Sequence, residues 1–351
     1  MGLYAVRIMR RFRRLRSVLS GGTRSSAGPA AAYSPPALDL ARICAAADRE
    51  RSRHSGCGAG CPDPPAADVG QGLVVAGETS VDGENARFWS ELCGSQLAKS
   101  LGVRDRGPES LARFDRWYLD FYPYLEGHIR PAELRGARTL EVGLGYGTVS
   151  EMIARHGAEY VGLDVSPGPV EMVHHRLRQA GLPGSAVRGS ILDPPFAPES
   201  FDAIIAIGCL HHTGDLALAI RRCRRLLRPG GRLTFMVYHA YSYRQAASNP
   251  ESMVRYALAE ASGFRGVLGG QSGAIRAAYD VNESGEAAPH TDFISRTSLQ
   301  HLCGGFATME CTTENMDQGP PFQGHDRMEL LRAGIAAEVG LDLYATARVG
   351  R

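Results

Sequence analysis

Between residues 137 and 240, short apolar runs alternate with segments whose apolar positions recur at helical spacing. The pattern predicts strands that begin near 137, 160, 186, 201 and 231, with helices over 148–156, 170–179 and 215–227. A near-continuous apolar run, such as the one at 201–208, is typical of a strand covered on both faces. The alternation therefore predicts an α/β domain built on a mostly parallel, doubly wound sheet.

The later part of the chain extends the same domain. Its pattern predicts two last strands, at 308–315 and 341–349, and a helix between them at 326–338. These two strands bring the sheet to seven. Residues 240–292 are longer than a connector needs and predict helices near 251–262 and 272–279. Because long insertions at a ligand edge commonly control specificity, we expect a lid there and one domain over 137–351.

An aromatic segment precedes the first strand and predicts an N-terminal helical cap over residues 81–136. Its rings recur at the three- and four-residue spacing of a helix face: Phe114, Trp117, Tyr118, Phe121 and Tyr122. Most of such a face packs on the sheet, and we expect one or two of these rings to touch a ligand.

Residues 1–80 differ in composition from the rest of the chain. The first 38 residues contain seven arginines and no acid, and an apolar stripe of Ile8, Phe12, Leu15 and Leu19 would form on a helix. This pattern is typical of a segment that binds an anionic membrane surface, here through residues 1–20, of a transit peptide, or of an RNA-binding segment. The simplest interpretation is an unstructured leader. Residues 22–80 are rich in Gly, Ala, Ser and Pro, so we expect a disordered tail.

Composition narrows the functional classes. The chain has 351 residues, 44% of them hydrophobic, and a formal net charge of +2, which gives no general case for nucleic-acid binding. No apolar stretch approaches the length of a membrane span, and we expect a cytoplasmic protein. Cys57 and Cys61 resemble half of a zinc site, but no matching pair follows, so we expect no metal.

A glycine-rich turn follows the first predicted strand. The strand carries Glu141 near its end and breaks at Gly143, Gly145 and Gly147. Since glycine has no Cβ, a ligand can lie against the main chain there, and the amides of the next helix point at it. A dinucleotide fingerprint needs a glycine where Thr148 stands, and the Gly-Lys-Ser/Thr of a phosphate-binding P-loop is absent. The turn predicts a nucleotide-like cofactor of another kind.

Three further motifs follow in order. The second strand ends on Asp164, and the 201–208 strand ends in Gly208 followed by His211 and His212. A Pro-Gly-Gly turn at 229–231 then opens the next strand. This order, over residues 137–240, resembles that of class I S-adenosylmethionine-dependent methyltransferases, in the small-molecule branch of methyltransferase types 11 and 12.

The resemblance implies a Rossmann-like methyltransferase fold and S-adenosylmethionine as cofactor. It also implies that Asp164 accepts hydrogen bonds from the two ribose hydroxyls, a role that suits the two oxygens of a carboxylate. By itself Asp164 could equally cap the helix that follows Pro167, and its place behind the glycine turn favours the ribose role. The predicted cofactor-binding residues are Glu141, Gly143, Gly145, Gly147, Asp164, Val165, Ser190, Ile191 and Gly208.

Two details depart from the family pattern. Members of the family often have an aspartate that accepts a bond from the adenine amino group, and Ser190 stands at the matching position. A hydroxyl accepts such a bond more weakly, and Ile191 could pack on the adenine ring. The Asp-Pro-Pro-Phe run at 193–196 resembles a motif of amino-methylating nucleic-acid methyltransferases. It precedes the fourth strand instead of ending it, so we interpret it as a loop.

The resemblance implies methyl transfer by in-line displacement, in which the protein mainly aligns donor and acceptor. His211 and His212 lie where an acceptor would approach, and either could be a general base or pack in the turn. His290 could act as a general base whose ring is oriented by Asp292, or both residues could lie in a solvated loop. Tyr118 and Tyr241 are weaker candidates.

The sequence therefore predicts a methyltransferase that acts on a small molecule such as a lipid, quinone, sugar or secondary metabolite. One alternative is a non-catalytic module that binds S-adenosylmethionine or an adenosine compound and serves as an interaction partner. Another is an NAD-type oxidoreductase, against which Thr148 argues.

Overall fold

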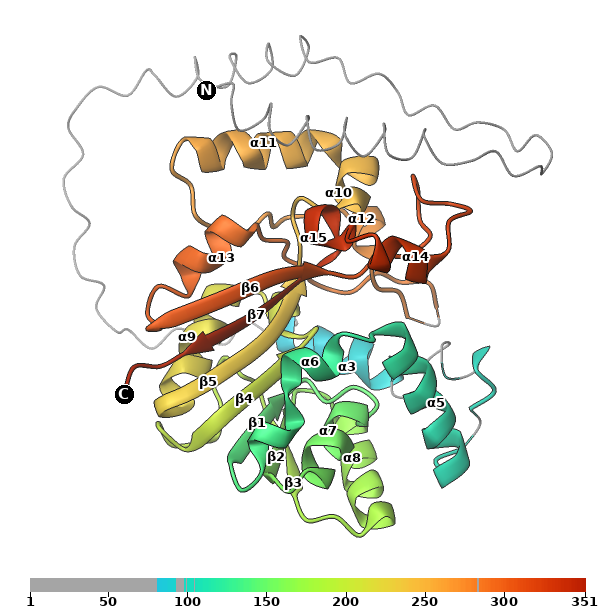
Figure 1. Ribbon diagram of the computed structural model, residues 1–351, viewed down its shortest axis with the longest axis vertical. Helices are drawn as coiled ribbons and strands as arrows, with labels where there is room; N and C mark the ends of the chain where they lie inside the picture. Colours follow the sequence, from blue (N-terminus) through green and yellow to red (C-terminus); the bar gives the residue numbers. More distant parts are fainter. Residues whose placement is uncertain (1–80, 93–97, 99, 104, 283) are drawn as a thin grey trace, which may run out of the picture.

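The computed structural model describes residues 81–351 except 93–97, 99, 104 and 283 (Figure 1). The predicted disordered tail and basic leader, together with Cys57 and Cys61, lie outside the described residues.

A seven-stranded sheet in the order β3-β2-β1-β4-β5-β7-β6 forms the centre of the described structure. Its strands are β1 (Arg138–Val142), β2 (Glu159–Asp164), β3 (Ser185–Arg188), β4 (Phe201–Ile207), β5 (Leu227–Tyr238), β6 (Thr308–Glu314) and β7 (Asp342–Arg348). β1 to β5 are parallel, whereas β7 runs antiparallel to both β5 and β6. The prediction of a mostly parallel, doubly wound sheet of seven strands is confirmed.

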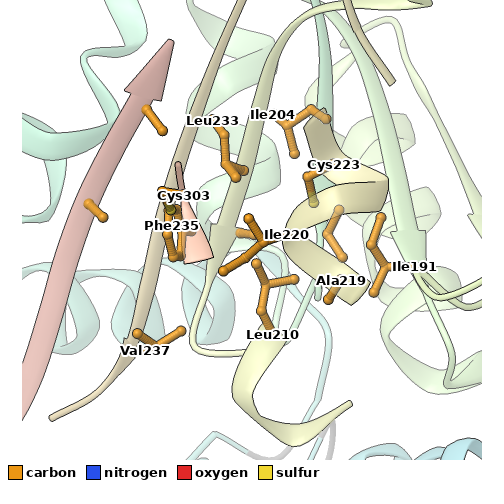
Figure 2. Packing of buried hydrophobic residues seen from close by; sticks show 14 of the residues in the cluster. Ile191, Ile204, Leu210, Ala219, Ile220, Cys223, Leu233, Phe235, Val237 and Cys303 are labelled. Carbon is orange, nitrogen blue, oxygen red and sulfur yellow. The ribbon is translucent and has the colours of Figure 1, made fainter. Parts of the chain in front are cut away.

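Helices cover both faces of the sheet (Figure 1). α6 (Leu125–Ile129), α7 (Thr148–Arg155) and α8 (Pro167–Ala180) pack on one face, whereas α9 (Leu216–Leu226) and α13 (Arg296–Leu302) pack on the other. β4 shows why both faces are apolar: Ala203 and Ile205 join the first layer, and Ile204 and Ala206 join the second. Figure 2 shows the second layer, which includes Ile204, Ile220, Cys223, Leu233 and Phe235.

Further helices precede the first strand or follow β4 and β5. α3 (Val81–Leu92) and α5 (Pro108–Phe121) precede the sheet, with a short 3-10 helix, η1 (Pro131–Leu134), before β1. A second one, η2 (Leu210–His212), follows β4. The segment after β5 contains α10 (Tyr243–Ser248), α11 (Pro250–Ala261) and α12 (Gly273–Ala277), which lie above the sheet in Figure 1. Its action as a lid stays a prediction.

Two segments differ from the sequence-based expectation. The helix expected near 326–338 is divided into α14 (Arg327–Arg332) and α15 (Ala336–Val339). Gly334 lies between them with φ of 71°, a left-handed conformation that interrupts an α-helix. β3 ends at Arg188, so Ser190 and Ile191 lie in the turn beyond the strand. The 193–196 segment is a loop, as predicted.

Candidate functional site

A cavity of about 340 Å³ opens beyond the carboxyl ends of β1, β2 and β4. Doubly wound sheets bind ligands at this edge, where the strand order reverses, here between β1 and β4. Gly147 does not line the cavity; the other predicted cofactor-binding residues do, namely Glu141, Gly143, Gly145, Asp164, Val165, Ser190, Ile191 and Gly208. Their contacts with a cofactor stay predictions.

The three glycines after β1 are needed for different reasons. All have positive φ: 76° at Gly143, 50° at Gly145 and 79° at Gly147. A Cβ on Gly143 would lie 2.4 Å from the Cβ of Cys209, and one on Gly147 would lie 2.8 Å from Cδ of Arg176. A Cβ on Gly145 would meet no atom within 4 Å. Gly143 and Gly147 therefore permit close packing, whereas Gly145 keeps the cavity open.

Asp164 ends β2 at the edge of the cavity and is 8% exposed. Its Oδ2 accepts a hydrogen bond from the Leu144 amide at 2.8 Å, and its Oδ1 accepts one from the Ser166 amide at 2.8 Å. Burial raises the pKa of this carboxyl group, and the two amide bonds oppose the shift. Ser166, and not Asp164, is the N-cap residue of α8. The capping alternative is therefore wrong, and each carboxylate oxygen can accept a further bond.

Glu141 lies on β1 beneath the glycine turn and is 3% exposed. Its Oε2 accepts hydrogen bonds from the hydroxyls of Ser150 and Tyr160, both at 2.6 Å. Burial raises the pKa of Glu141 to about 8, although these two bonds oppose the shift. The carboxyl group thus joins β1, α7 and β2 below the cavity floor.

The helical cap contributes aromatic rings to the cavity. Of the predicted cap rings, Phe114, Tyr118 and Tyr122 line it, whereas Trp117 stacks on Phe121 at 5.1 Å between centroids. That one or two of these rings touch a ligand stays a prediction.

A buried arginine fixes α5 over the glycine turn. The side chain of Arg176 on α8 has no exposed surface and donates to both oxygens of Asp115 at 2.8 and 2.9 Å. It also pairs with Glu151 on α7 at 3.0 Å. The Thr148 hydroxyl donates to Asp115 at 2.6 Å. Because a buried charge is stable only when paired, this cluster holds the cap in place.

α3 adds a second contact across the cavity. Asn85 is 4% exposed, and its Nδ2 donates to the carbonyl oxygen of His212 at 2.7 Å. The Trp89 ring packs on the His212 ring at 4.8 Å between centroids. Both side chains line the cavity. The sequence pattern offered no motif that could have identified Asn85.

The two adjacent histidines occupy different environments. His211 is fully buried, and neither of its ring nitrogens has a hydrogen-bond partner among the described residues. Burial moves its pKa well below the usual range. His212 lines the cavity, but His211 does not. The structure therefore brings His212 to the site and leaves His211 behind the wall.

The orientation of His212 is fixed by main-chain groups. Its Nδ1 lies 2.7 Å from the carbonyl oxygen of His290. A carbonyl only accepts, so we assign the ring proton to Nδ1, which leaves a lone pair on Nε2. Nε2 is buried, has no hydrogen-bond partner among the described residues, and lies 3.7 Å from Oδ2 of Asp280. Burial lowers the pKa of His212, although the Asp280 charge opposes this.

The predicted pair of His290 and Asp292 forms, but outside the cavity. The His290 Nε2 lies 3.1 Å from Oδ1 of Asp292, and neither residue lines the cavity wall. His290 contributes its carbonyl group instead of its ring. Of the two weaker candidates, Tyr118 lines the cavity, whereas the Tyr241 hydroxyl donates to Glu260 away from it.

Asp280 and Tyr238 are site residues that the sequence did not indicate. Asp280 comes from the segment after α12, and Tyr238 is the last residue of β5. The Tyr238 hydroxyl donates to Asp280 at 3.0 Å, and both side chains line the cavity. Burial raises the pKa of the Asp280 carboxyl, against the influence of His212 and Arg244. A lone acid in a long connecting segment carries no local pattern that predicts this position.

In the described ranges, no group of three His, Cys, Asp or Glu side chains is arranged to hold a metal ion. A search of the same ranges for a helix long and apolar enough to cross a lipid bilayer also found none.

Comparison with known proteins identifies the central part of the chain. A sequence profile of the methyltransferase domain matches residues 140–235. A ubiquinone biosynthesis O-methyltransferase of Azorhizobium caulinodans is 34% identical over 103 residues, which are 29% of this chain and 40% of that protein. A protein of the same name from Paracidovorax citrulli is 31% identical over 146 residues, which are 36% of this chain and 60% of that protein. The chain thus spans between 40% and 60% of the length of these two relatives.

Among solved structures, a methyltransferase of Mesorhizobium loti that depends on S-adenosylmethionine aligns with a TM-score of 0.43 at 18% identity, over 66% of this chain and 99% of that chain. The matched residues 140–235 contain the glycine turn, Asp164 and Gly208, and Gly143, Gly145, Asp164 and Gly208 line the cavity. Residues 140–235 of this chain are therefore similar to the methyltransferase domain.

Proposed function

We propose that the protein transfers a methyl group from S-adenosylmethionine to a hydroxyl group of a small-molecule acceptor, with His212 as the general base. The observation that carries this proposal is the Nε2 of His212, a residue of the cavity wall: this nitrogen is buried and has no hydrogen-bond partner among the described residues. The names of the two relatives, which are O-methyltransferases, support oxygen as the methylated atom.

The cavity suits this cofactor in three respects. The main chain at Gly145 is open, because a Cβ there would meet no atom within 4 Å. Each oxygen of Asp164 accepts one amide bond and keeps capacity for a ribose hydroxyl. Val165 and Ile191 offer apolar surface to the adenine ring. When bound, the cofactor supplies a methyl group on a sulfonium, which is already an activated donor.

The protein's part in the reaction is the removal of a proton. As the O–CH₃ bond forms, the bond from the methyl carbon to the sulfonium sulfur would break; the O–H bond of the acceptor breaks as well, and Nε2 of His212 takes the proton. The ring then carries a positive charge 3.7 Å from the Asp280 carboxylate, which stabilises it. The bond from Nδ1 to the His290 carbonyl holds the ring in place throughout.

The variant His212→Asn tests this proposal. The asparagine amide can still donate to the His290 carbonyl, but Nε2 is lost. We expect turnover with methyl-labelled S-adenosylmethionine and a metabolite extract to fall by about a hundredfold, which is the usual scale of general-base catalysis. Affinity for the demethylated product, measured by calorimetry, should stay unchanged. His174→Asn is a matched control, because that ring hydrogen-bonds to the Ala186 carbonyl away from the cavity.

A pH profile gives a second readout. His212 must be neutral to accept a proton, so the rate should rise with pH and level off below 6.5, the pKa of an ordinary histidine. Burial lowers the pKa of His212 most, and the charge of His290 also lowers it, whereas Asp280, the bond to the His290 carbonyl and Asp292 raise it. Full activity in His212→Asn would refute the base role. Cofactor binding with no labelled product from any extract would favour the alternative of a non-catalytic binding module.

A further inference from the structure

We infer that the acceptor part of the cavity is built for a ring-bearing compound that carries no anionic group. The inference rests on the proposed methyl transfer and specifies its acceptor class. We define the acceptor chamber as the wall formed by Trp89, Tyr118, Tyr122, His212, Met236, Tyr238, Asp280 and Tyr344. These residues come from α3, α5, η2, β5, β7 and the segments that follow α5 and α12.

The charges around the cavity are of one sign. Among the described residues, four carboxyl side chains line it and no arginine or lysine does; the four are Asp82, Asp164 and Asp280, together with Glu141, whose pKa of about 8 keeps it uncharged at neutral pH. The one basic group in this lining is His212, whose pKa is lowered by burial. Proteins that bind carboxylate or phosphate ligands usually present arginine or lysine to them. The described wall offers neither.

Two arginines lie close behind the chamber, but both are engaged elsewhere. Arg244 pairs with Asp317, donates to the Ala278 carbonyl at 2.9 Å and stacks over the Tyr279 ring at 4.5 Å. Arg327 donates to the Met316 carbonyl at 2.6 Å and lies over the Phe121 ring at 3.8 Å. Neither lines the cavity, so an incoming anion would meet neither guanidinium directly.

Asp280 is the group that an acceptor would meet. The one described side chain that donates to its carboxylate is Tyr238, whose hydroxyl lies 3.2 Å from Oδ1 and 3.0 Å from Oδ2. His212 Nε2, at 3.7 Å, holds a lone pair and has no proton to donate. Asp280 therefore keeps acceptor capacity toward the cavity. A hydroxyl on the acceptor can satisfy it, whereas a second carboxylate would add an unfavourable like-charge contact where burial strengthens electrostatics.

The rest of the chamber is aromatic. The Tyr118 and Tyr122 rings lie 5.0 Å apart, and Tyr344 stacks on His128 at 4.4 Å between centroids. Tyr238 contacts the His211 ring at 4.2 Å on its other side, which fixes the wall. Rings held in this way present large flat surfaces, and aromatic pairs prefer offset or edge-to-face contact. A planar ring is the acceptor shape that such walls favour.

A matched pair of probes tests both parts of the inference. 4-Hydroxybenzamide and 4-hydroxybenzoate share the ring and the hydroxyl group and differ in charge. We would titrate each into the full chain saturated with S-adenosylhomocysteine and follow binding by ligand-observed NMR. The neutral amide should bind at least about tenfold more tightly than the anion, because the chamber contains the Asp280 carboxyl group and no arginine or lysine among the described residues. Equal or tighter binding of the benzoate, or no binding of the amide, would overturn the inference.

The variant Asp280→Asn tests whether Asp280 causes the preference for the neutral amide over the benzoate. The variant keeps an oxygen that can accept from Tyr238 and removes the charge, so the amide-to-benzoate ratio should fall severalfold. Asp193→Asn is the control, because Asp193 is exposed and does not line the cavity. An unchanged ratio in Asp280→Asn would contradict the role of Asp280. Binding needs no turnover, so a preference for the amide with no methylation would reject the proposed function and leave this inference standing.

Discussion

The two halves of the cavity differ in how far apart in the chain their residues lie. The cofactor half is built from residues 141–208, in which Leu144 and Asp164 are bonded across 20 positions. The acceptor half joins α3, α5, the end of β5, Asp280 and β7, and its bond from Asn85 to His212 spans 127 positions. A short contiguous segment thus forms the proposed donor site, whereas the proposed acceptor site exists only once the whole domain has folded.

The largest expected effect comes from blocking the cofactor half. In Gly145→Arg, the side chain would enter space where no atom lies within 4 Å of the new Cβ. We expect affinity for S-adenosylhomocysteine to fall by more than about a thousandfold, roughly 4 kcal/mol, measured by calorimetry. Gly181→Arg is the control, since Gly181 also has positive φ and open surroundings but lies at the end of α8. Normal binding by Gly145→Arg would place the cofactor elsewhere.

The connection between the halves can be broken at Asp115. Asp115→Ala removes the carboxylate that accepts hydrogen bonds from both terminal nitrogens of Arg176, and it leaves Glu151 as the charge partner. We expect the free energy of unfolding to fall by about 3 kcal/mol in urea denaturation, because a buried charge loses its main partner. Asp120→Ala, at an exposed position of the same helix, should change little. Equal losses in the two variants would show that the cluster does not hold the cap.

A smaller effect is expected from a change at Asn85. Whether turnover or cofactor affinity falls tells to which half of the cavity this residue belongs. Asn85→Ala removes the hydrogen bond to the His212 carbonyl, so the base is held less firmly. Methylation should slow by about tenfold, roughly 1.4 kcal/mol, while affinity for S-adenosylhomocysteine stays the same. Arg87→Ala, exposed on the same helix, is the control. A loss of cofactor affinity with normal turnover would instead assign Asn85 to the cofactor half.

A further expected effect is a pH dependence of stability that comes from Glu141. Its pKa is raised from 4.5 to about 8 in the folded protein, so the native state holds a proton that the unfolded chain releases. The stabilising contribution is therefore complete at low pH and is lost as pH rises through this window. Relative to wild type, Glu141→Gln should become more stable between about pH 5 and about pH 9 in denaturant titrations. Glu159→Gln, exposed on β2, should show no such trend.

The difference between the halves also explains what the sequence could predict. The order of strands and helices follows from local periodicity, and it is confirmed along the sheet. The glycine turn and Asp164 could be predicted because their chemistry depends on neighbours within one strand–helix–strand unit. Their convergence on one cavity is what the structure adds.

Other features were not predictable because they depend on distant contacts. His211 and His212 are identical in type and adjacent, and only the turn of η2 decides which ring reaches the cavity. Asp280 is one acid in a long segment, and its role comes from its approach to His212 and Tyr238. Arg176 was part of a predicted helix, and nothing in the local pattern indicated that it would be buried against Asp115.

Most of the elements that carry the aromatic rings of the acceptor chamber, and Asn85, which bonds to the His212 carbonyl, lie near the two ends of the described residues. α3 and α5 precede the first strand, and β7 is the last. Substitutions in these elements would change the proposed acceptor site and leave residues 141–208, the proposed donor site, unaltered.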